Sequence, residues 1–382
     1  MTKDTTTKPP LTRAATLAKA HAEITANRLD ALVAASPGNV YYTSGTYFMT
    51  QKNIPERLGL VSITSDDDPA FVYCTIEEGH ATQESWLKNL RGYTEFADQP
   101  VDVLVDVLKK QGADRGRIGV EKKFFSAIDF ERLQNRLPKA EFVDADPIFD
   151  RMRAIKTPEE IRILGDAAMA TDAAIRVAFT EAAAGMTELA VGEMMVAEAK
   201  NRGGEKLLHL VLAAGANGFK IHAEPGTTQL KSGDVLRTDF GMIWSRFYLS
   251  DIARTAFVGR LEPWQDETYR KLEHVQQTTI AAMKPGVKAS DVYRICADAF
   301  ARAGVEFKMP HIGHGIGVVI HENPMLHPFD HTILEPGMVF MLEPAIRGRD
   351  GFYHTEDMIE ITETGQRVLS RSADWATPMV IS

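Results

Sequence analysis

The sequence predicts an α+β protein of two domains, an N-terminal α/β domain over residues 1–152 and a larger C-terminal domain over residues 153–382. Three observations lead to this prediction. The 382 residues exceed the ~100–200 residues of one typical domain. Short apolar runs alternate with helical patterns in the first part of the chain, whereas long helical patterns and strand-like runs make up the second. The composition, 44% hydrophobic and 25% charged, is that of an ordinary globular protein.

The elements of the first domain follow from its apolar runs and turn residues. After a polar arm, a helical pattern covers residues 11–26 and an apolar run at 29–33 predicts a buried strand. Ser-Pro-Gly-Asn at residues 36–39 then predicts a turn. We expect further strands at residues 58–64, 70–73 and 117–120, and helices at 101–111 and 128–136. An aromatic stretch either packs in the core or lines a site entrance: Tyr41, Tyr42, Tyr47 and Phe48.

The second domain starts at a strong helix signal. Thr157 can cap a helix, Pro158 suits its first position and Glu160 completes a capping box. Apolar residues at helical spacing continue this helix to Phe179. We expect further helices at residues 188–201, 267–283 and 289–303, and strands at 235–240, 247–257, 338–344 and 358–362. The domain boundary is therefore expected near residues 149–155.

Charge and apolar runs exclude two classes of partner. Acidic residues outnumber basic ones by 52 to 43, and the resulting net charge of −9 argues against a nucleic-acid surface. The N-terminal segment lacks the apolar run of a signal peptide, and no run approaches the ~20 apolar residues of a membrane span. Cys74 and Cys296 match no thiolate metal site. We expect a soluble, cytoplasmic protein with no nucleic-acid or membrane partner.

Four carboxylates and one histidine occur in apolar strands or beside glycines. They are Asp239, Asp251, His314, Glu343 and Glu356. Each one alone has a structural explanation, such as a turn, a salt bridge or a loop hydrogen bond. A carboxylate inside an apolar strand, however, costs several kcal/mol unless it is paired or bound to a metal. The five groups together therefore predict a metal centre.

The ligand types indicate which metals and which chemistry to expect. Oxygen donors with one imidazole suit manganese, cobalt, iron or zinc. Four carboxylates carry too much negative charge for one divalent ion but nearly neutralise two. Two ions about 3.5–4 Å apart can share a water, lower its pKa and stabilise the tetrahedral intermediate that forms when the water attacks a carbonyl.

The motifs around these residues resemble those of the pita-bread metallohydrolases, the superfamily of methionine aminopeptidase, aminopeptidase P, prolidase and creatinase. In order, the motifs are DFG, SDIART, GHGIGVVIHENP, EPGMVFMLEP and TED. The resemblance extends from about residue 155 to the C-terminus, and residues 12–150, with NVYYTSGTY, resemble the N-terminal domain of the prolidase and creatinase branch. It implies a C-terminal pita-bread fold after a creatinase-type N-terminal α/β domain. It also implies a homodimer in which the N-terminal domain caps the partner's cleft.

The resemblance implies roles for the five predicted ligands. Asp239 would bind one ion, and His314 and Glu343 the other. Asp251 and Glu356 would bridge both ions. Glu343 would in addition orient or deprotonate the attacking water, which makes it a catalytic residue as well as a ligand.

Three further residues match family positions. His222, in GANGFKIHAEPG, would contact the substrate or the leaving group, and His321, in HENP, would stabilise the oxyanion. A structural hydrogen bond is the alternative explanation for each histidine. Arg254 would support a ligand carboxylate, and a surface salt bridge is its alternative.

Two departures from the family pattern concern the metal centre and its surroundings. The segment between Asp239 and Asp251 is one residue longer than is usual in the family, and a β-bulge would accommodate the extra residue. His354 stands where an arginine is common, and Arg347 follows the EPAI sequence. We therefore place His354 and Arg347 among the residues that support the site or contact substrate.

A third departure concerns the substrate carboxylate. No Arg or Lys lies between His321 and Glu343, where the dipeptidases of the family place an arginine. A substrate that ends in a free carboxylate needs such a cation. Arg347, Arg349 or a residue of a partner chain are the candidates to replace it.

We expect a dinuclear metal-dependent hydrolase that cleaves an amide bond, most simply that of a small Xaa-Pro peptide. Manganese is the first candidate for the two ions, and cobalt, iron and zinc are alternatives.

A second hypothesis keeps the metal site but assigns a small non-peptide metabolite as the substrate, as in the related ectoine hydrolase or dimethylsulfoniopropionate lyase. The aromatic insertion with Trp244, Phe247 and Tyr248 would then reshape the pocket. A third hypothesis, a binding module without catalysis, would require lost ligands, and every ligand position is filled.

Overall fold

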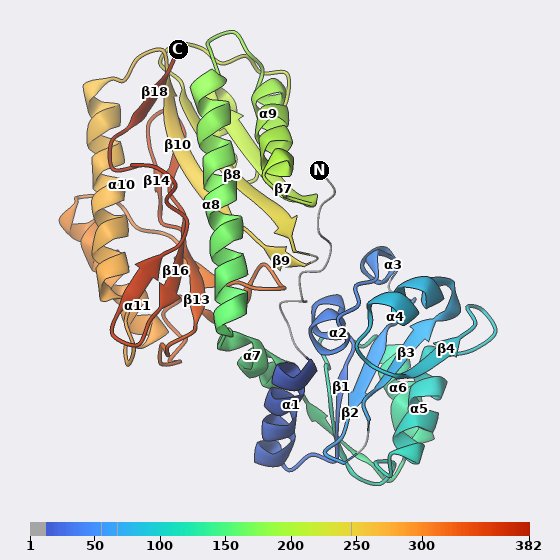
Figure 1. Ribbon diagram of the computed structural model, residues 1–382. Coiled ribbons are helices and arrows are strands. Elements are labelled where there is room, and N and C mark those ends of the chain that lie inside the picture. The colour runs from blue at the N-terminus through green and yellow to red at the C-terminus, as the bar shows by residue number, and fades with distance from the viewer. Residues whose placement is uncertain (1–12, 55, 67, 246) are drawn as a thin grey trace. The chain divides into compact units, whose positions relative to one another are not determined.

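A computed structural model describes residues 13–54, 56–66, 68–245 and 247–382 (Figure 1). The chain divides into a first compact unit that ends at Arg153 and a second over Ala154–Ser382. The predicted polar arm lies outside the described residues. No helix of the described part is both long and apolar enough to cross a membrane. The predicted α+β class is confirmed by the mixture of helices and sheets.

The first unit is built around a six-stranded sheet with the strand order β4-β3-β2-β1-β5-β6. Its strands β1, β5 and β6 run parallel to one another, which is the arrangement of an α/β domain. The strands are β1 (Ala31–Ala34), β2 (Leu60–Ile63), β3 (Ala70–Cys74), β4 (Asn89–Tyr93), β5 (Arg117–Val120) and β6 (Glu141–Asp144). The helices are α1 (Arg13–Asn27), α2 (Pro37–Ser44), α3 (Met49–Asn53), α4 (Glu78–Glu84), α5 (Pro100–Lys110), α6 (Ala127–Arg136), α7 (Asp146–Ala154) and the short 3₁₀ helix η1 (Thr75–Glu77).

Residues 36–39 form the start of a helix, so the predicted turn is wrong. The Ser36 side chain caps helix α2 by accepting a hydrogen bond from the Asn39 amide, and Pro37 takes the first helical position. Serine at the cap and proline just after it are favourable at a helix N-terminus, and here they outweigh the turn tendency of Pro-Gly. The aromatic residues of this region pack in the core, because Tyr42 and Phe48 are buried and Phe48 stacks on Phe71.

The second unit begins with the predicted helix. Helix α8 (Pro158–Glu181) starts with a complete capping box between Thr157 and Glu160. The other predicted helices are also confirmed, as α9 (Glu188–Asn201), α10 (Pro263–Ala282) and α11 (Ala289–Arg302). Helix α8 packs along β8 and β10, and α10 and α11 pack against each other (Figure 1).

Two larger sheets and a two-stranded ribbon complete the second unit. The first sheet has the order β18-β10-β8-β7, with β9 paired to β8, and the second has the order β12-β11-β13-β16-β17. The first sheet consists of β7 (Lys206–Ala214), β8 (Val235–Trp244), β9 (Tyr248–Leu249), β10 (Ile252–Val258) and β18 (Met379–Ile381). The second consists of β11 (Gly313–Gly315), β12 (Glu322–Met325), β13 (Val339–Leu342), β16 (Asp357–Ile361) and β17 (Gln366–Val368), and the ribbon of β14 (Ala345–Arg347) and β15 (Phe352–His354). The 3₁₀ helix η2 (Gly215–Phe219) follows β7.

The extra residue between the two aspartates does not produce the expected β-bulge. Strand β8 pairs with β9 and β10 in one continuous antiparallel register, in which Ala253 lies opposite Asp239 and Tyr248 lies opposite Trp244. The additional residue therefore leaves the pairing of β8 with β9 and β10 unbroken. Side chains two residues apart on a strand share a face, so Asp251 and Ala253 face the same side as Asp239. The register shift in this sheet instead lies in β7, between Leu207 and His209.

Candidate metal centre

The five predicted ligands lie on or beside strands of both larger sheets of the second unit. Asp239 lies on β8 and Asp251 directly before β10. His314 lies on β11, and Glu343 and Glu356 flank β13 and β16 in the chain. The Glu356 amide donates a backbone hydrogen bond to Ala253 of β10, which connects the two sheets beside the centre.

The side chains of these residues converge. His314 Nε2 lies 3.8 Å from Asp251 Oδ2 and 3.7 Å from Glu343 Oε1. The same nitrogen lies 3.9 Å from Glu356 Oε1. Asp251, His314 and Glu356 present ligand atoms within 4.8 Å of one another. Burial lowers the pKa of His314 to about 4, so its imidazole is neutral and has a lone pair available for a metal.

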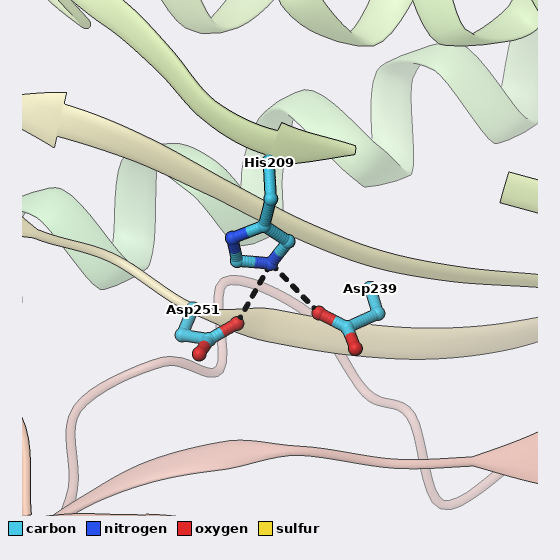
Figure 2. Close-up of side chains that lie close together, drawn as sticks. All are labelled: His209, Asp239 and Asp251. Atoms are coloured by element: carbon cyan, nitrogen blue, oxygen red, sulfur yellow. Dashed lines mark hydrogen bonds and ion pairs between the residues drawn. The ribbon is translucent and has the colours of Figure 1, made fainter. Parts of the chain in front are cut away.

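A second group of ligand atoms contains a histidine that the sequence analysis did not predict. His209, Asp239 and Asp251 also present ligand atoms within 4.8 Å of one another, so Asp251 belongs to both groups. His209 Nε2 lies 2.8 Å from Asp239 Oδ1 and 3.1 Å from Asp251 Oδ1 (Figure 2). The available signal was a histidine within the apolar run LLHLVLAA, which forms β7.

The buried carboxylates of the cluster lie so close together that bound cations would stabilise their negative charges. Burial raises the pKa of Asp251 to about 7, and the charges of Asp239 and Glu343 add to this effect although His209 opposes it. Burial, followed by the charge of Asp251, raises the pKa of Glu356 well above its usual value. Among the described residues, none donates a hydrogen bond to the buried oxygen Glu356 Oε2. These oxygen donors, together with imidazole, suit divalent ions such as manganese, cobalt, iron or zinc.

The neighbouring aspartates favour the protonated, positively charged form of His209. Burial alone would lower its pKa, but hydrogen bonds to Asp239 and Asp251 outweigh burial and raise the pKa of His209 to about 10. Burial also opposes ionisation of Asp239, yet the hydrogen bond from His209 holds the pKa of Asp239 below its usual value. In the metal-free protein, a proton on His209 thus partly balances the charge of the two aspartates.

Two further histidines surround Glu343. His311, a second residue that the sequence analysis missed, has Nδ1 3.3 Å from Glu343 Oε1, and this contact raises the pKa of His311. The only sequence signal was its place three residues before His314 in HIGHGIG. His354, which the sequence analysis assigned to the surroundings of the site, has Nε2 3.9 Å from Glu343 Oε2. Burial lowers the pKa of His354.

The centre opens into a cavity of about 1280 Å³ that is lined by residues of the second unit. His222, His321 and Arg347 all line it, together with the five predicted ligands and His209. The ring of His321 lies 4.0 Å from that of His314, centroid to centroid. Arg347 stacks over Phe219 at the cavity wall, with 5.5 Å between the guanidinium carbon and the ring centroid. The predicted substrate-side residues and the predicted ligands therefore share one space.

The aromatic insertion lies elsewhere. Trp244 and Tyr248 are buried, and neither lines the cavity. The Trp244 indole donates a hydrogen bond to Ser250 Oγ, and the Tyr248 hydroxyl donates one to Glu160 Oε1. These aromatic residues serve the core of the second unit, so the pocket is not reshaped by them.

Arg254 lies behind the centre rather than at it. Its guanidinium is almost completely buried and donates hydrogen bonds to Asp172 Oδ1 at 2.7 Å and Asp357 Oδ1 at 2.9 Å. It also donates to the backbone carbonyl of Glu356 at 2.6 Å. Arg254 therefore contacts the backbone of a predicted ligand instead of its carboxylate, and it is no surface salt bridge.

We predict that Arg254→Met lowers the free energy of unfolding of the protein by about 3–5 kcal/mol, because it removes the buried positive charge that pairs with the carboxylates of both Asp172 and Asp357. Urea-induced unfolding followed by tryptophan fluorescence measures this loss. Arg162→Met is the control, because Arg162 forms exposed ion pairs on helix α8 and its loss should change stability little. Equal stability of the two variants would contradict the importance of the Arg254 network.

Comparisons with known proteins agree with this architecture. Residues 162–363 match the metallopeptidase family M24, and residues 17–155 match the creatinase/prolidase N-terminal domain. An Xaa-Pro dipeptidase of Pyrococcus furiosus is 30% identical over 353 residues, which cover 91% of this chain and 94% of that protein. An Xaa-Pro dipeptidase of Lactobacillus helveticus is 29% identical over 298 residues, which cover 76% and 80%. The crystal structure of the prolidase from Pyrococcus horikoshii OT3 superposes with a TM-score of 0.81 at 27% identity, over 94% of this chain and 98% of that chain.

Proposed function

The chain belongs to the metallopeptidase family M24, and we propose that it is an Xaa-Pro dipeptidase that uses two divalent metal ions to hydrolyse the amide bond before proline. The observation that carries the dinuclear part of this proposal is the position of Asp251. Its carboxylate belongs to both groups of convergent ligand atoms. One carboxylate between two sites is what two adjacent ions require, and four carboxylates supply the charge to balance them. The similarity to Xaa-Pro dipeptidases supports the choice of bond.

Asp239, Asp251, His314, Glu343 and Glu356 would hold the two ions. When bound, such ions lower the pKa of a shared water and stabilise negative charge on a carbonyl oxygen. Glu343 accepts a proton from the water as the water oxygen bonds to the carbonyl carbon, and it passes this proton to the proline nitrogen as the C–N bond breaks. His311 and His354, on either side of the Glu343 carboxylate, hold it in place for this transfer.

The cavity residues position the substrate. His321 donates a hydrogen bond to the carbonyl oxygen as negative charge develops on it. His222, on the cavity wall, contacts the leaving proline. Arg347, also on this wall, binds the free carboxylate of the dipeptide and replaces the arginine that is missing between His321 and Glu343.

A substrate panel tests the function. The metal-loaded protein should hydrolyse Xaa-Pro dipeptides and leave matched Xaa-Ala dipeptides and longer Xaa-Pro peptides largely intact. Failure to cleave any Xaa-Pro dipeptide, in a folded protein that contains metal, would exclude the dipeptidase function. Manganese as the resident metal, the homodimer and the cytoplasmic location stay predictions that metal analysis, light scattering and fractionation can check.

We predict that Arg347→Ala raises KM for an Xaa-Pro dipeptide by about 10–100-fold, because a hydrogen bond to a charged group contributes about 1.5–3 kcal/mol. For the dipeptide amide, which lacks the carboxylate, the KM of Arg347→Ala should be nearly the same as the KM of the wild type for that amide. Arg349→Ala is the matched control, because Arg349 stacks on Trp264 and does not line the cavity. An unchanged KM of Arg347→Ala for the free dipeptide would show that another group binds the carboxylate.

A further inference from the structure

We propose that His209 is a sixth protein ligand of the metal centre, on the side of Asp239, and that its Nε2 atom binds the ion directly. This inference rests on the proposed function in one respect, since it requires that ions bind at this centre. It assigns a role to a residue outside the five ligands that the family resemblance implies. It also changes the donor set, because each of the two ions would then have one imidazole ligand.

The position of His209 in the sheet directs its side chain toward the aspartates. His209 lies opposite Gly241 in the pairing of β7 with β8, and Val211 lies opposite Asp239. Residues two apart on a strand share a face, so His209 and Asp239 face the same side. The register shift between Leu207 and His209 is a β-bulge directly before this histidine, and bulges next to functional sites commonly redirect a side chain.

The distances fit coordination of a shared ion. His209 Nε2 is directed between Asp239 Oδ1, at 2.8 Å, and Asp251 Oδ1, at 3.1 Å (Figure 2). Ligand atoms with bonds of about 2.1 Å to one ion lie about 3.0 Å apart at adjacent octahedral positions and about 3.4 Å apart at tetrahedral ones. The two distances from His209 Nε2 are thus close to the separation of adjacent octahedral ligands.

Gly241, which has no side chain, leaves space for the imidazole of His209. A Cβ atom at Gly241 would lie 2.5 Å from His209 Cε1 and 2.6 Å from the carbonyl oxygen of Ser250. The second of these neighbours is backbone, which cannot move aside easily. Glycine in the DFG motif therefore allows the ring of His209 to approach the backbone of β8 beside Asp239.

The added imidazole has a consequence for metal preference. A site of carboxylates alone suits hard ions such as manganese, whereas imidazole favours cobalt, zinc, iron and nickel. With His209 as a ligand, the ion at Asp239 and Asp251 has a nitrogen donor of its own. We therefore expect this position to bind cobalt more tightly than manganese, and removal of His209 to reduce that difference.

Titration of the metal-free protein with Co²⁺ tests the inference. The wild type should bind two ions per chain, whereas His209→Gln should bind one of them with unchanged affinity and the other at least about 100-fold more weakly, since even groups that only support a ligand contribute 10–100-fold. Glutamine keeps a hydrogen-bond donor for the two aspartates but is a poor metal ligand. His80→Gln is the matched control, because His80 lies exposed on helix α4 of the first unit and contacts Glu84.

A spectroscopic measurement tests coordination by His209 independently of metal affinity. In the Co²⁺-loaded wild type, the paramagnetically shifted proton NMR spectrum should show ring resonances of two coordinated imidazoles, and His209→Gln should retain those of one. Wild-type affinity and an unchanged spectrum in His209→Gln would overturn the inference and leave His209 as a hydrogen-bond partner of the aspartates. A folded wild type that binds no Co²⁺ would overturn the proposed function as well, so the two failures are distinguishable.

Discussion

Glu343→Gln is expected to lower kcat for Xaa-Pro hydrolysis by at least about 100-fold, in line with the contribution of a general base. The glutamine amide has the same shape as the carboxylate but cannot accept the proton of the attacking water. Because Glu343 lies at the surface of the cavity and only its chemistry changes, the variant should fold like the wild type. The measurement is kcat at saturating metal and substrate, with metal content determined on the same sample.

Glu335→Gln is the control for this variant. Glu335 is an exposed glutamate of the same segment, and its side chain does not line the cavity. It should retain wild-type kcat. A near-normal kcat of Glu343→Gln, with both metals bound, would mean that Glu343 is not the proton acceptor.

Asp251→Asn is expected to have the largest effect on metal binding. Its carboxylate is common to both groups of ligand atoms, so the affinity for both ions should fall and hydrolysis should be lost. In the metal-free protein, by contrast, we expect the substitution to stabilise the fold. Burial and neighbouring carboxylates raise the pKa of Asp251 to about 7, so at pH 8 its charge destabilises the metal-free fold. Metal-free Asp251→Asn should therefore unfold at a higher temperature than the metal-free wild type.

Thermal unfolding with and without Co²⁺ measures both effects in one experiment. The wild type should be stabilised by the metal, and Asp251→Asn should not, because ligands that bind only the folded state stabilise it by mass action. Asp298→Asn, an exposed substitution on helix α11, should behave like the wild type in both conditions. Metal-induced stabilisation of Asp251→Asn equal to that of the wild type would contradict the shared position of this carboxylate.

Much of the second unit could be predicted from local sequence signals. The capping box at Thr157 and Glu160 sets the start of α8, and α9 has buried residues at helical spacing, among them Val191, Met195 and Ala199. The predicted ligands were recognisable because a carboxylate is unusual in an apolar strand. The convergence of Asp251, His314 and Glu356 depends on strand pairing between distant segments, and only the structure provides it.

The predictions that were wrong or incomplete also have physical reasons. Ser36 caps a helix although Pro-Gly follows it, because the cap and the proline both favour a helix N-terminus. The register shift lies in β7, between Leu207 and His209, whereas β8 pairs with β9 and β10 without a shift. His209 was missed because one histidine in an apolar run has no pattern of its own. Its partners come from β8 and the start of β10.

Stepwise addition of Mn²⁺ or Co²⁺ to the metal-free protein, with bound metal and Ala-Pro hydrolysis measured on each sample, tests the two-ion dipeptidase mechanism most directly. We predict no hydrolysis by the metal-free protein. Activity should increase with bound metal and reach its maximum at two ions per chain, in line with two groups of ligand atoms that share Asp251. Full activity of the metal-free protein, or a folded protein with two bound ions that leaves Ala-Pro intact, would contradict the proposed function.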